Sequence, residues 1–153
     1  MRSKTENARA IQRASAPLDL SHTPWRRLVL SAKRDIWCLV DADDCDWIMQ
    51  WRWNWGWHNR TPWKFYAKRN VGTERSTIYL HRELMLRAQP NVVLDRVVDH
   101  INGQSLDNRQ TNLRWVTAKV NRANALDRSQ IPSLDAIVAA LVAGLEDAEE
   151  MPF

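Results

Sequence analysis

The segment from Val97 to Asn124 constrains the fold of this chain more than any other part of the sequence. Its residues are VVDHINGQSLDNRQTNLRWVTAKVNRAN. A short β-branched run is followed by a loop of turn-forming residues, a second short strand pattern and a helical pattern with Thr117 as its N-cap. The segment therefore predicts a strand, loop, strand and helix within about thirty residues.

Asp99 and His100 are the chemically notable pair within this segment. Adjacent residues of a strand point to opposite faces, so the two flank one site only where the strand ends and twists. A carboxylate can hold a hard cation, and an imidazole can accept a proton at neutral pH. From the pair alone, a hydrogen-bonded structural role is favoured over catalysis.

The spacing of the amides favours a nuclease site over that alternative. Asn112 lies twelve residues after His100, and Asn121 lies nine residues further. With the blocks DHING, LDNR, NLRWVT and the final Asn, the chain resembles the HNH endonuclease family. The resemblance is strongest to the phage-type and intron-homing branch, in which Asn often replaces the last His. The upstream YLHREL and VDADDCDWIMQWRW extend it over roughly residues 28–125.

The resemblance implies a ββα-metal motif with a defined role for each of four residues. His100 matches the general base that activates water, and Asp99 and Asn121 match the metal ligands. Asn112 matches the middle Asn, which ties the loop together and orients the catalytic His. The implied activity is hydrolysis of a DNA phosphodiester bond, as a nick or a double-strand cut.

The donor chemistry of the proposed ligands is consistent with one hard cation. Asp99 and Asn121 offer oxygen atoms, which favour Mg²⁺ or Mn²⁺ as a single ion that keeps several waters. A site with so few protein charges is expected to bind the metal loosely without the phosphate. For His81, in YLHREL, a structural hydrogen bond is the expected role, and a position behind the site is the alternative.

The charge distribution slightly favours a polyanionic partner, and the resemblance implies that this partner is double-stranded DNA. The net charge is +4, with 1 − 6 = −5 on residues 127–153 and 21 − 12 = +9 on residues 1–126. Arg109 and Arg114 lie next to the proposed site in sequence. Further candidates for phosphate contacts interleave with tryptophans: Arg52, Arg60, Lys64, Lys68 and Arg69. A solvated surface position is the alternative for each, and core packing is the expected role of the tryptophans.

The chain as a whole is expected to be an α+β protein with a small N-terminal antiparallel sheet region leading into the ββα motif. We predict a basic flexible arm over residues 1–24, a nuclease domain over 25–126 and an acidic tail over 127–153. RRLVLS and IWCLVDA predict a hairpin, and the Trp residues at 51, 53, 55 and 57 predict a strand with one aromatic face. YLHRELMLR predicts a helix.

The tail is predicted to contain an amphipathic helix over residues 133–147 with Ser133 as its N-cap. Its apolar stripe is expected to dock on the domain, and a homodimer or partner interface is the alternative. No run of about 18 apolar residues predicts a membrane span, and no secretory signal pattern is found. Two cysteines without disulfide spacing favour the cytoplasm, or the host cytoplasm if the protein is phage-encoded.

Two functions from different classes follow from the sequence. The first is a metal-dependent HNH-type DNA endonuclease, and the second is a non-cleaving DNA-binding regulatory or packaging accessory protein on the same fold. The intact Asp-His pair favours the enzyme. Homing relatives usually carry a DNA-reading segment after the motif, whereas an acidic tail follows it here. Specificity is therefore expected from the N-terminal sheet and arm, or from a partner, or to be low.

Overall fold

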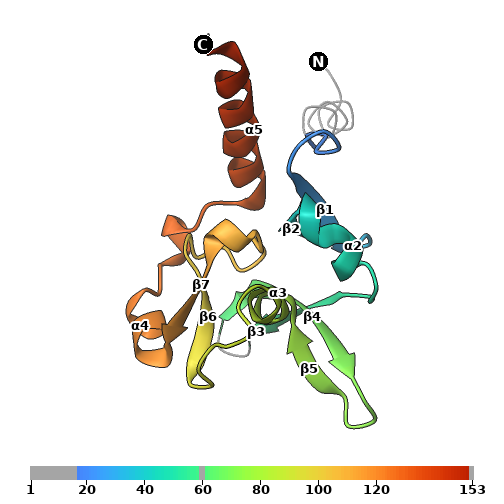
Figure 1. Ribbon diagram of the computed structural model, residues 1–153, viewed down its shortest axis with the longest axis vertical. Coiled ribbons are helices and arrows are strands. Elements are labelled where there is room, and N and C mark those ends of the chain that lie inside the picture. Colours follow the sequence, from blue (N-terminus) through green and yellow to red (C-terminus); the bar gives the residue numbers. More distant parts are fainter. Residues whose placement is uncertain (1–16, 59–60, 152–153) are drawn as a thin grey trace, which may run out of the picture.

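The computed structural model describes residues 17–58 and 61–151, and these residues form an α+β fold, as predicted (Figure 1). Three small antiparallel sheets contain two, three and two strands. Arg60 and residues 1–16 of the predicted basic arm lie outside the described residues. No helix in the described part of the chain is long and apolar enough to cross a membrane.

The predicted N-terminal hairpin is confirmed. Strands β1 (Trp25–Ser31) and β2 (Ile36–Asp41) pair antiparallel, and Asp35 has a φ of 52° in the turn between them. The 3-10 helix η1 (Ala42–Asp44) and helix α2 (Cys45–Ile48) follow. The ring of Trp47 in α2 meets that of Trp51, which lies beyond the end of the helix, edge to face with centroids 5.2 Å apart.

The second sheet has the order β3 (Asn54–His58), β4 (Thr61–Val71) and β5 (Ser76–Tyr79). Gly72 has a φ of +72° in the turn between β4 and β5, a conformation that glycine adopts without strain. The predicted aromatic strand is shorter than expected, because β3 begins at Asn54 and only two tryptophans lie within it. Trp53, just before the strand, is buried in the core, whereas Trp57 is 57% exposed.

Helix α3 (Leu80–Ala88) follows β5 directly and confirms the helix predicted from its spacing. Its Leu80, Leu84 and Met85 are buried. They join Cys38 and Val40 of β2 in the main hydrophobic core, which lies between the first two sheets and the third. The helix thus packs between the second sheet and the strand that carries Asp99 and His100.

The predicted strand, loop, strand and helix unit is also present. Strands β6 (Arg96–His100) and β7 (Leu113–Thr117) pair antiparallel, and the short η2 (Gln110–Asn112) closes the loop between them. Helix α4 (Ala118–Ala123) begins after Thr117, whose side chain accepts a hydrogen bond from the Val120 backbone N–H at 3.2 Å.

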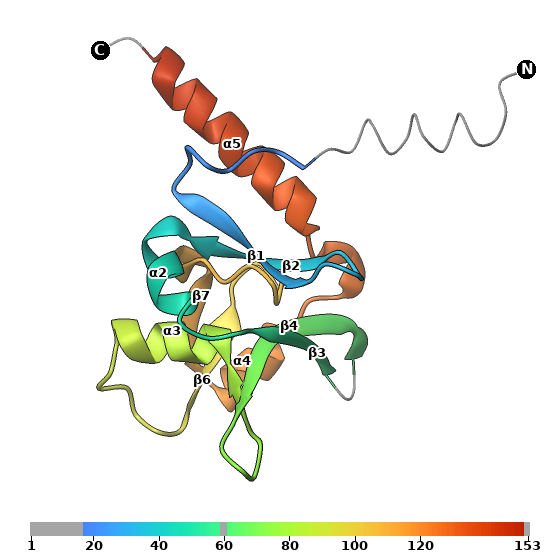
Figure 2. The same ribbon diagram turned by 90° about the vertical axis from the view of Figure 1, so that its right-hand side faces the viewer.

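The chain ends with η3 (Arg128–Gln130) and the long helix α5 (Leu134–Glu150), which extends three residues beyond its predicted end. Ser133 caps α5 by accepting from the Ala136 N–H at 3.1 Å. The helix lies across the β1–β2 sheet and extends away from the body (Figure 2). Its Ile137 and Val138 are buried against a second apolar cluster that includes Leu20 and Leu39. The apolar stripe of α5 therefore packs against the rest of this chain, as expected.

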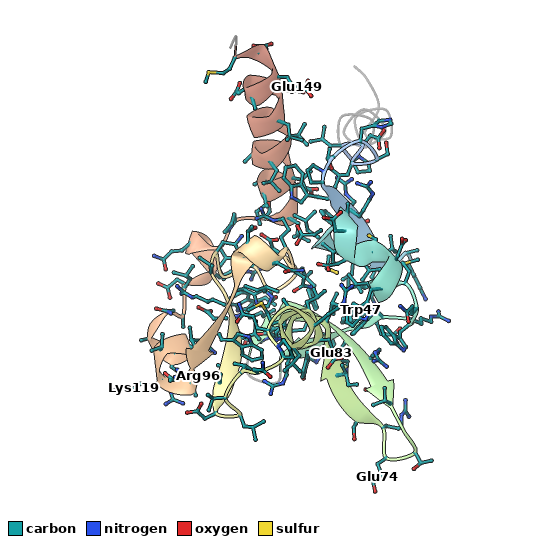
Figure 3. All side chains as sticks on the ribbon, in the orientation of Figure 1. Trp47, Glu74, Glu83, Arg96, Lys119 and Glu149 are labelled. Carbon is teal, nitrogen blue, oxygen red and sulfur yellow. The ribbon has the colours of Figure 1, made fainter. Side chains whose placement is uncertain are left out.

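The acidic end of α5 is far from α4 and the start of β6. In Figure 3, Glu149 lies at the outer end of α5, whereas Lys119 and Arg96 lie together on the opposite part of the molecule. The negative charge of the tail is therefore separated from the unit that carries Asp99 and His100.

Candidate active site

The end of β6 brings Asp99 and His100 to a single cavity, although the two residues are adjacent in the strand. Both side chains are buried, with exposed fractions of 9% and 7%. The cavity has a volume of about 540 Å³. Its polar and aromatic lining residues are Thr61, Trp63, Lys64, Tyr66, Tyr79, His81, Asp99, His100, Asn121, Arg122 and Asn124. The predicted base and both predicted metal ligands thus line one cavity.

His100 is held by a residue of the following loop. Its Nε2 lies 3.0 Å from Oδ1 of Asn108, which is fully buried. Because an amide oxygen only accepts, this contact requires the hydrogen of the neutral imidazole to be on Nε2 and leaves the Nδ1 lone pair free to accept a proton. Burial lowers the pKa of His100 to about 4, so the ring is neutral at neutral pH.

Two further rings lie beside His100, and a third packs against them. The centroid of the His81 ring lies 4.9 Å from that of His100, and Tyr66 lies 5.6 Å from His81 and 6.3 Å from His100. Tyr79 packs against His81 at 5.7 Å. Burial, and then the neighbouring His100, lowers the pKa of His81 well below its ordinary value. His81 therefore lies beside His100 as a second neutral imidazole.

Asp99 is engaged by an arginine of the neighbouring strand. Nε and Nη2 of Arg114 both donate to Oδ2 of Asp99, at 2.9 and 2.8 Å, and the register pairs the two residues directly. Nδ2 of Asn124 lies 3.5 Å from the same oxygen. All three contacts fall on Oδ2, so Oδ1 is the oxygen through which Asp99 would meet a cation.

The residues around Asp99 fit a hard divalent cation. Asn121 of α4 lines the same cavity and supplies an amide oxygen, so Asp99 and Asn121 would hold the ion. No group of three or more His, Cys, Asp or Glu side chains suited to a metal is found among the described residues. Within the described part of the chain, Asp99 is thus the one carboxylate that lines this cavity.

The loop between β6 and β7 is closed by Asn112. Its Oδ1 accepts from the Asn102 N–H at 3.0 Å, and its Nδ2 donates to Asn102 Oδ1 at 3.0 Å and to the Asp107 carbonyl at 2.9 Å. The resemblance implied that this amide ties the loop together and also orients the catalytic His. Asn112 makes the loop contacts, but the side chain that contacts the His100 ring is Asn108.

The side chain of Asp107 also holds the loop in place. It is fully buried, and Arg109 donates to both of its carboxylate oxygens, at 2.8 and 2.7 Å. Asn102 Nδ2 donates to Asp107 Oδ2 at 2.9 Å. On the other side of the loop, Leu39 of β2 donates to the Leu106 carbonyl and accepts from the Asn108 N–H, both at 2.8 Å. The loop is thereby anchored to the N-terminal hairpin.

The predicted phosphate-contacting residues divide into three groups. Lys64 lines the cavity, and burial lowers its pKa while the charge of Asp99 opposes that shift. Arg109 and Arg114 lie near the cavity but are engaged by Asp107 and Asp99. The remaining described candidates do not line it: Arg52, Lys68 and Arg69. Arg69 stacks on Trp51 and Trp53, with its Cζ 4.6 and 5.3 Å from the two ring centroids.

The structure adds functional candidates that the sequence reasoning assigned elsewhere or did not name. Asn108 was not named as a site residue from the sequence, because a single amide in a loop has no periodicity that reveals its partner. Asn124 is the C-cap of α4 and also lines the cavity. Tyr66 and Arg122 line it as well, from strand and helix patterns that do not indicate which residues face a site.

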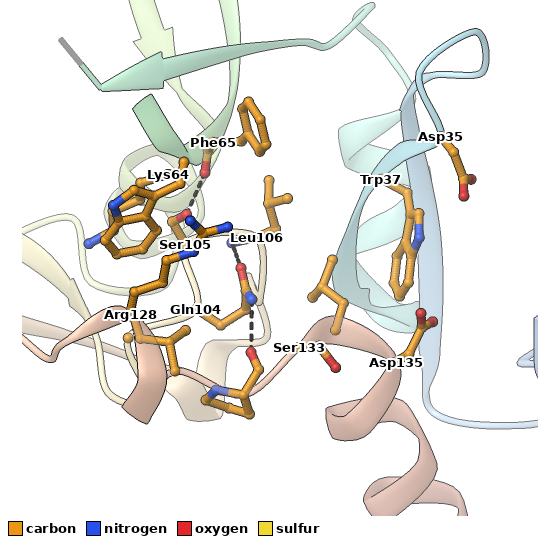
Figure 4. Close-up of a pocket in the computed structure, with 15 residues that line it drawn as sticks. Asp35, Trp37, Lys64, Phe65, Gln104, Ser105, Leu106, Arg128, Ser133 and Asp135 are labelled. Carbon is orange, nitrogen blue, oxygen red and sulfur yellow. Dashed lines mark hydrogen bonds between the residues drawn. The ribbon is translucent and has the colours of Figure 1, made fainter. Parts of the chain in front are cut away.

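A second cavity of about 420 Å³ lies on the other side of Lys64 and Trp63, between the loop and the start of α5 (Figure 4). Gln104 Nε2 donates to the Pro132 carbonyl at 2.9 Å across it, and Ser105 Oγ donates to the Phe65 carbonyl. Neither Asp99 nor His100 lines this cavity. These contacts hold the loop against β4 and the segment before α5.

Comparison with known proteins gives a match over the segment that contains Asp99 and His100. The model of the HNH endonuclease family matches residues 79–123. The match to the HNH endonuclease family is confined to this segment, which is less than a third of the chain. A stretch of 36 residues is 56% identical to the uncharacterized HNH endonuclease L247 of Acanthamoeba polyphaga mimivirus. That stretch covers 24% of this chain and 9% of the viral protein. No solved structure matches the chain.

Proposed function

We propose that the protein is a metal-dependent DNA endonuclease in which His100 is the general base. The observation that carries this proposal is the joint placement of Asp99, His100 and Asn121 at one cavity, with the Nε2 side of the imidazole already occupied by Asn108. A base must be neutral and must present a lone pair to the nucleophile. His100 meets both requirements at neutral pH.

The residues of the cavity divide the work of phosphodiester hydrolysis. Nδ1 of His100 accepts the proton of the attacking water. Asp99 and Asn121 hold one Mg²⁺ or Mn²⁺ ion, which when bound supplies positive charge for the developing negative charge of the phosphate. Lys64 adds a second positive charge to the same cavity, and Arg122 adds one at its exposed helical edge. The proposed substrate is double-stranded DNA. The proposed compartment is the cytoplasm, which is that of the host cell if the protein is phage-encoded.

A non-cleaving DNA-binding protein is the second candidate, and one observation favours it. The ion pair between Arg114 and Asp99 places a permanent cation on the carboxylate that would hold the metal. A regulatory or packaging accessory protein has no need of a free carboxylate there. We favour the endonuclease for two reasons. The contacts of Arg114 and Asn124 with Asp99 fall on Oδ2 and leave Oδ1 for a cation. DNA binding without cleavage does not require an unprotonated Nδ1 on His100.

The two candidates are separated by relaxation of supercoiled plasmid DNA by the purified protein. The assay is run with Mg²⁺, Mn²⁺ or Ni²⁺ and with EDTA, on the wild type and on His100→Ala. His22→Ala, which removes an exposed imidazole, is the matched control. We expect metal-dependent nicking or linearisation by the wild type and the control, and a loss of roughly 10²- to 10⁴-fold in His100→Ala.

The outcomes separate cleavage from binding. A wild type that shifts DNA in a gel but leaves plasmid intact with all three metals supports the second candidate and overturns the first. Equal cleavage by wild type and His100→Ala would show that the protein is a nuclease with a different base. Thermal melting of each variant verifies that the fold is retained.

A further inference from the structure

The side chain of Asn108 makes a specific contact with His100 from a position enclosed by the protein. It is fully buried, and its backbone N–H donates to the Leu39 carbonyl of β2 at 2.8 Å. Its neighbour Asp107 is held by Arg109 and Asn102, so the backbone on that side is also fixed. Oδ1 of Asn108 is therefore held at 3.0 Å from Nε2 of His100 by the loop and not by the imidazole alone.

We propose that Asn108 is a positioning residue that selects the tautomer of His100 with the hydrogen on Nε2, so that Nδ1 is the proton acceptor. This inference rests on the proposed function for its catalytic consequence. An amide turned by half a rotation would present Nδ2–H to Nε2, and the hydrogen of the imidazole would then be on Nδ1. In that arrangement Nδ1 accepts no proton, so the orientation of one buried amide decides whether His100 is a base.

The second neighbour of the amide is too weak to reverse this orientation. Nδ2 of Asn108 has no hydrogen-bond partner within the described residues, and the side chain also interacts with the Cys38 thiol. Burial raises the pKa of Cys38 to about 12, so this thiol is neutral and a weak hydrogen-bond partner. The thiol therefore does not favour the turned orientation of the amide, in which Nδ2 would face the imidazole.

The tautomer is measured directly by long-range ¹H–¹⁵N NMR of histidine-labelled protein without DNA or metal, with His100 assigned through His100→Ala. We expect the pattern of a protonated Nε2 and an unprotonated Nδ1 in the wild type and in Asn108→Asp, which keeps an acceptor oxygen in place. In Asn108→Leu, which is of similar size but cannot accept, we expect a mixture of tautomers. A wild-type spectrum with the hydrogen on Nδ1 overturns the inference without the need for any variant.

Plasmid cleavage by the same variants tests the catalytic consequence. We expect Asn108→Leu to cleave roughly ten- to a hundredfold more slowly than the wild type, and Asn108→Asp to recover most of that loss. Asn91→Leu, at an exposed amide outside the cavity, controls for the introduced leucine and is expected to match the wild type. If Asn108→Leu does not fold, Asn108→Ser, whose hydroxyl is too short to reach the imidazole, replaces it.

The outcomes distinguish this inference from the proposed function. A wild type that cleaves DNA alongside a folded Asn108→Leu that cleaves equally fast overturns the inference alone. A wild type that never cleaves overturns the proposed function, and the NMR experiment still decides whether Asn108 sets the tautomer.

Discussion

The loop of residues 101–112 and helix α5 are both fixed to strand β2, but by opposite kinds of contact. The loop is held by directional bonds, among them the two 2.8 Å backbone bonds to Leu39 and the buried carboxylate of Asp107. The helix is held by the apolar side chains of Ile137 and Val138, which pack on the Leu39 side chain and its neighbours. One residue of β2 thus contributes its backbone to the site and its side chain to the helix.

The difference has a functional meaning. Hydrogen bonds fix the position of individual atoms, as a general base requires, whereas apolar contact stabilises an element without fixing single atoms. The loop also leaves buried polar groups unpaired if one partner is removed, and such groups are costly. We therefore expect substitutions in the loop to affect both stability and cleavage, and substitutions at α5 to affect stability alone.

Loss of the Asp107 carboxylate is expected to have the largest effect. Asp107→Ala removes the partner of both Arg109 nitrogens and of Asn102, and should lower the free energy of unfolding by about 3 kcal/mol. Urea denaturation measures this loss. Asp95→Ala breaks an ion pair of 3.6 Å in which the Asp95 side chain is 70% exposed, and it should change stability by less than about 0.5 kcal/mol. If both substitutions lowered the free energy of unfolding equally, burial would not explain the strength of the Asp107 contacts.

Truncation of the helix contact should come next. Ile137→Ala is expected to cost about 2 kcal/mol, because Ile137 is buried in the cluster with Leu20 and Leu39. Leu145→Ala, further along the same stripe but outside that cluster, should cost less than about 1 kcal/mol. Plasmid cleavage below the melting temperature should remain within about twofold of the wild type for both, since neither residue lines the cavity. A folded Ile137→Ala that no longer cleaves would show that the helix controls the site.

Acid should destabilise the folded protein through His100, whose ring contacts the loop at Asn108. The pKa of His100 is lowered to about 4 in the folded protein, so the unfolded chain binds a proton near pH 6.5 and the folded protein does not. Stability is therefore fully present above pH 6.5 and is lost as the pH falls toward 4, by about 2 kcal/mol between pH 7 and pH 5. His81, whose pKa is also lowered, contributes in the same direction.

Comparison of the wild type with His100→Gln isolates this contribution. Urea unfolding at pH 7 and pH 5 should show a smaller loss of stability in the variant, because the glutamine does not titrate. An identical loss in both proteins would assign the acid sensitivity to other groups.

Different parts of this molecule were predictable from sequence to different degrees. The strand, loop, strand and helix unit, the caps at Thr117 and Ser133 and the apolar stripe of α5 follow from periodicity and local chemistry, and all are present in the structure. The Asp-His pair and its amides were found through spacing and resemblance. The roles of Asn108, Arg109 and Arg114 could not be predicted in this way, because each depends on a partner that only the folded loop and strand pairing bring close.

Arg114 allows the contribution of strand pairing to be tested separately from that of the loop. It contacts Asp99 from β7 and is not part of the loop. Its guanidinium lies 2.8 Å from Asp99 Oδ2 and repels any divalent cation on the same carboxylate, but its side chain is 42% exposed and the effect is screened. Arg114→Gln should therefore lower the Mg²⁺ concentration for half-maximal cleavage by only about threefold. Arg122→Gln removes a cation from the same cavity but not from the Asp99 carboxylate, and it should weaken DNA binding with little change in the Mg²⁺ requirement. If Arg114→Gln raises the Mg²⁺ requirement instead, then Arg114 serves to orient Asp99, and strand pairing contributes to the precision of the site as much as the loop does.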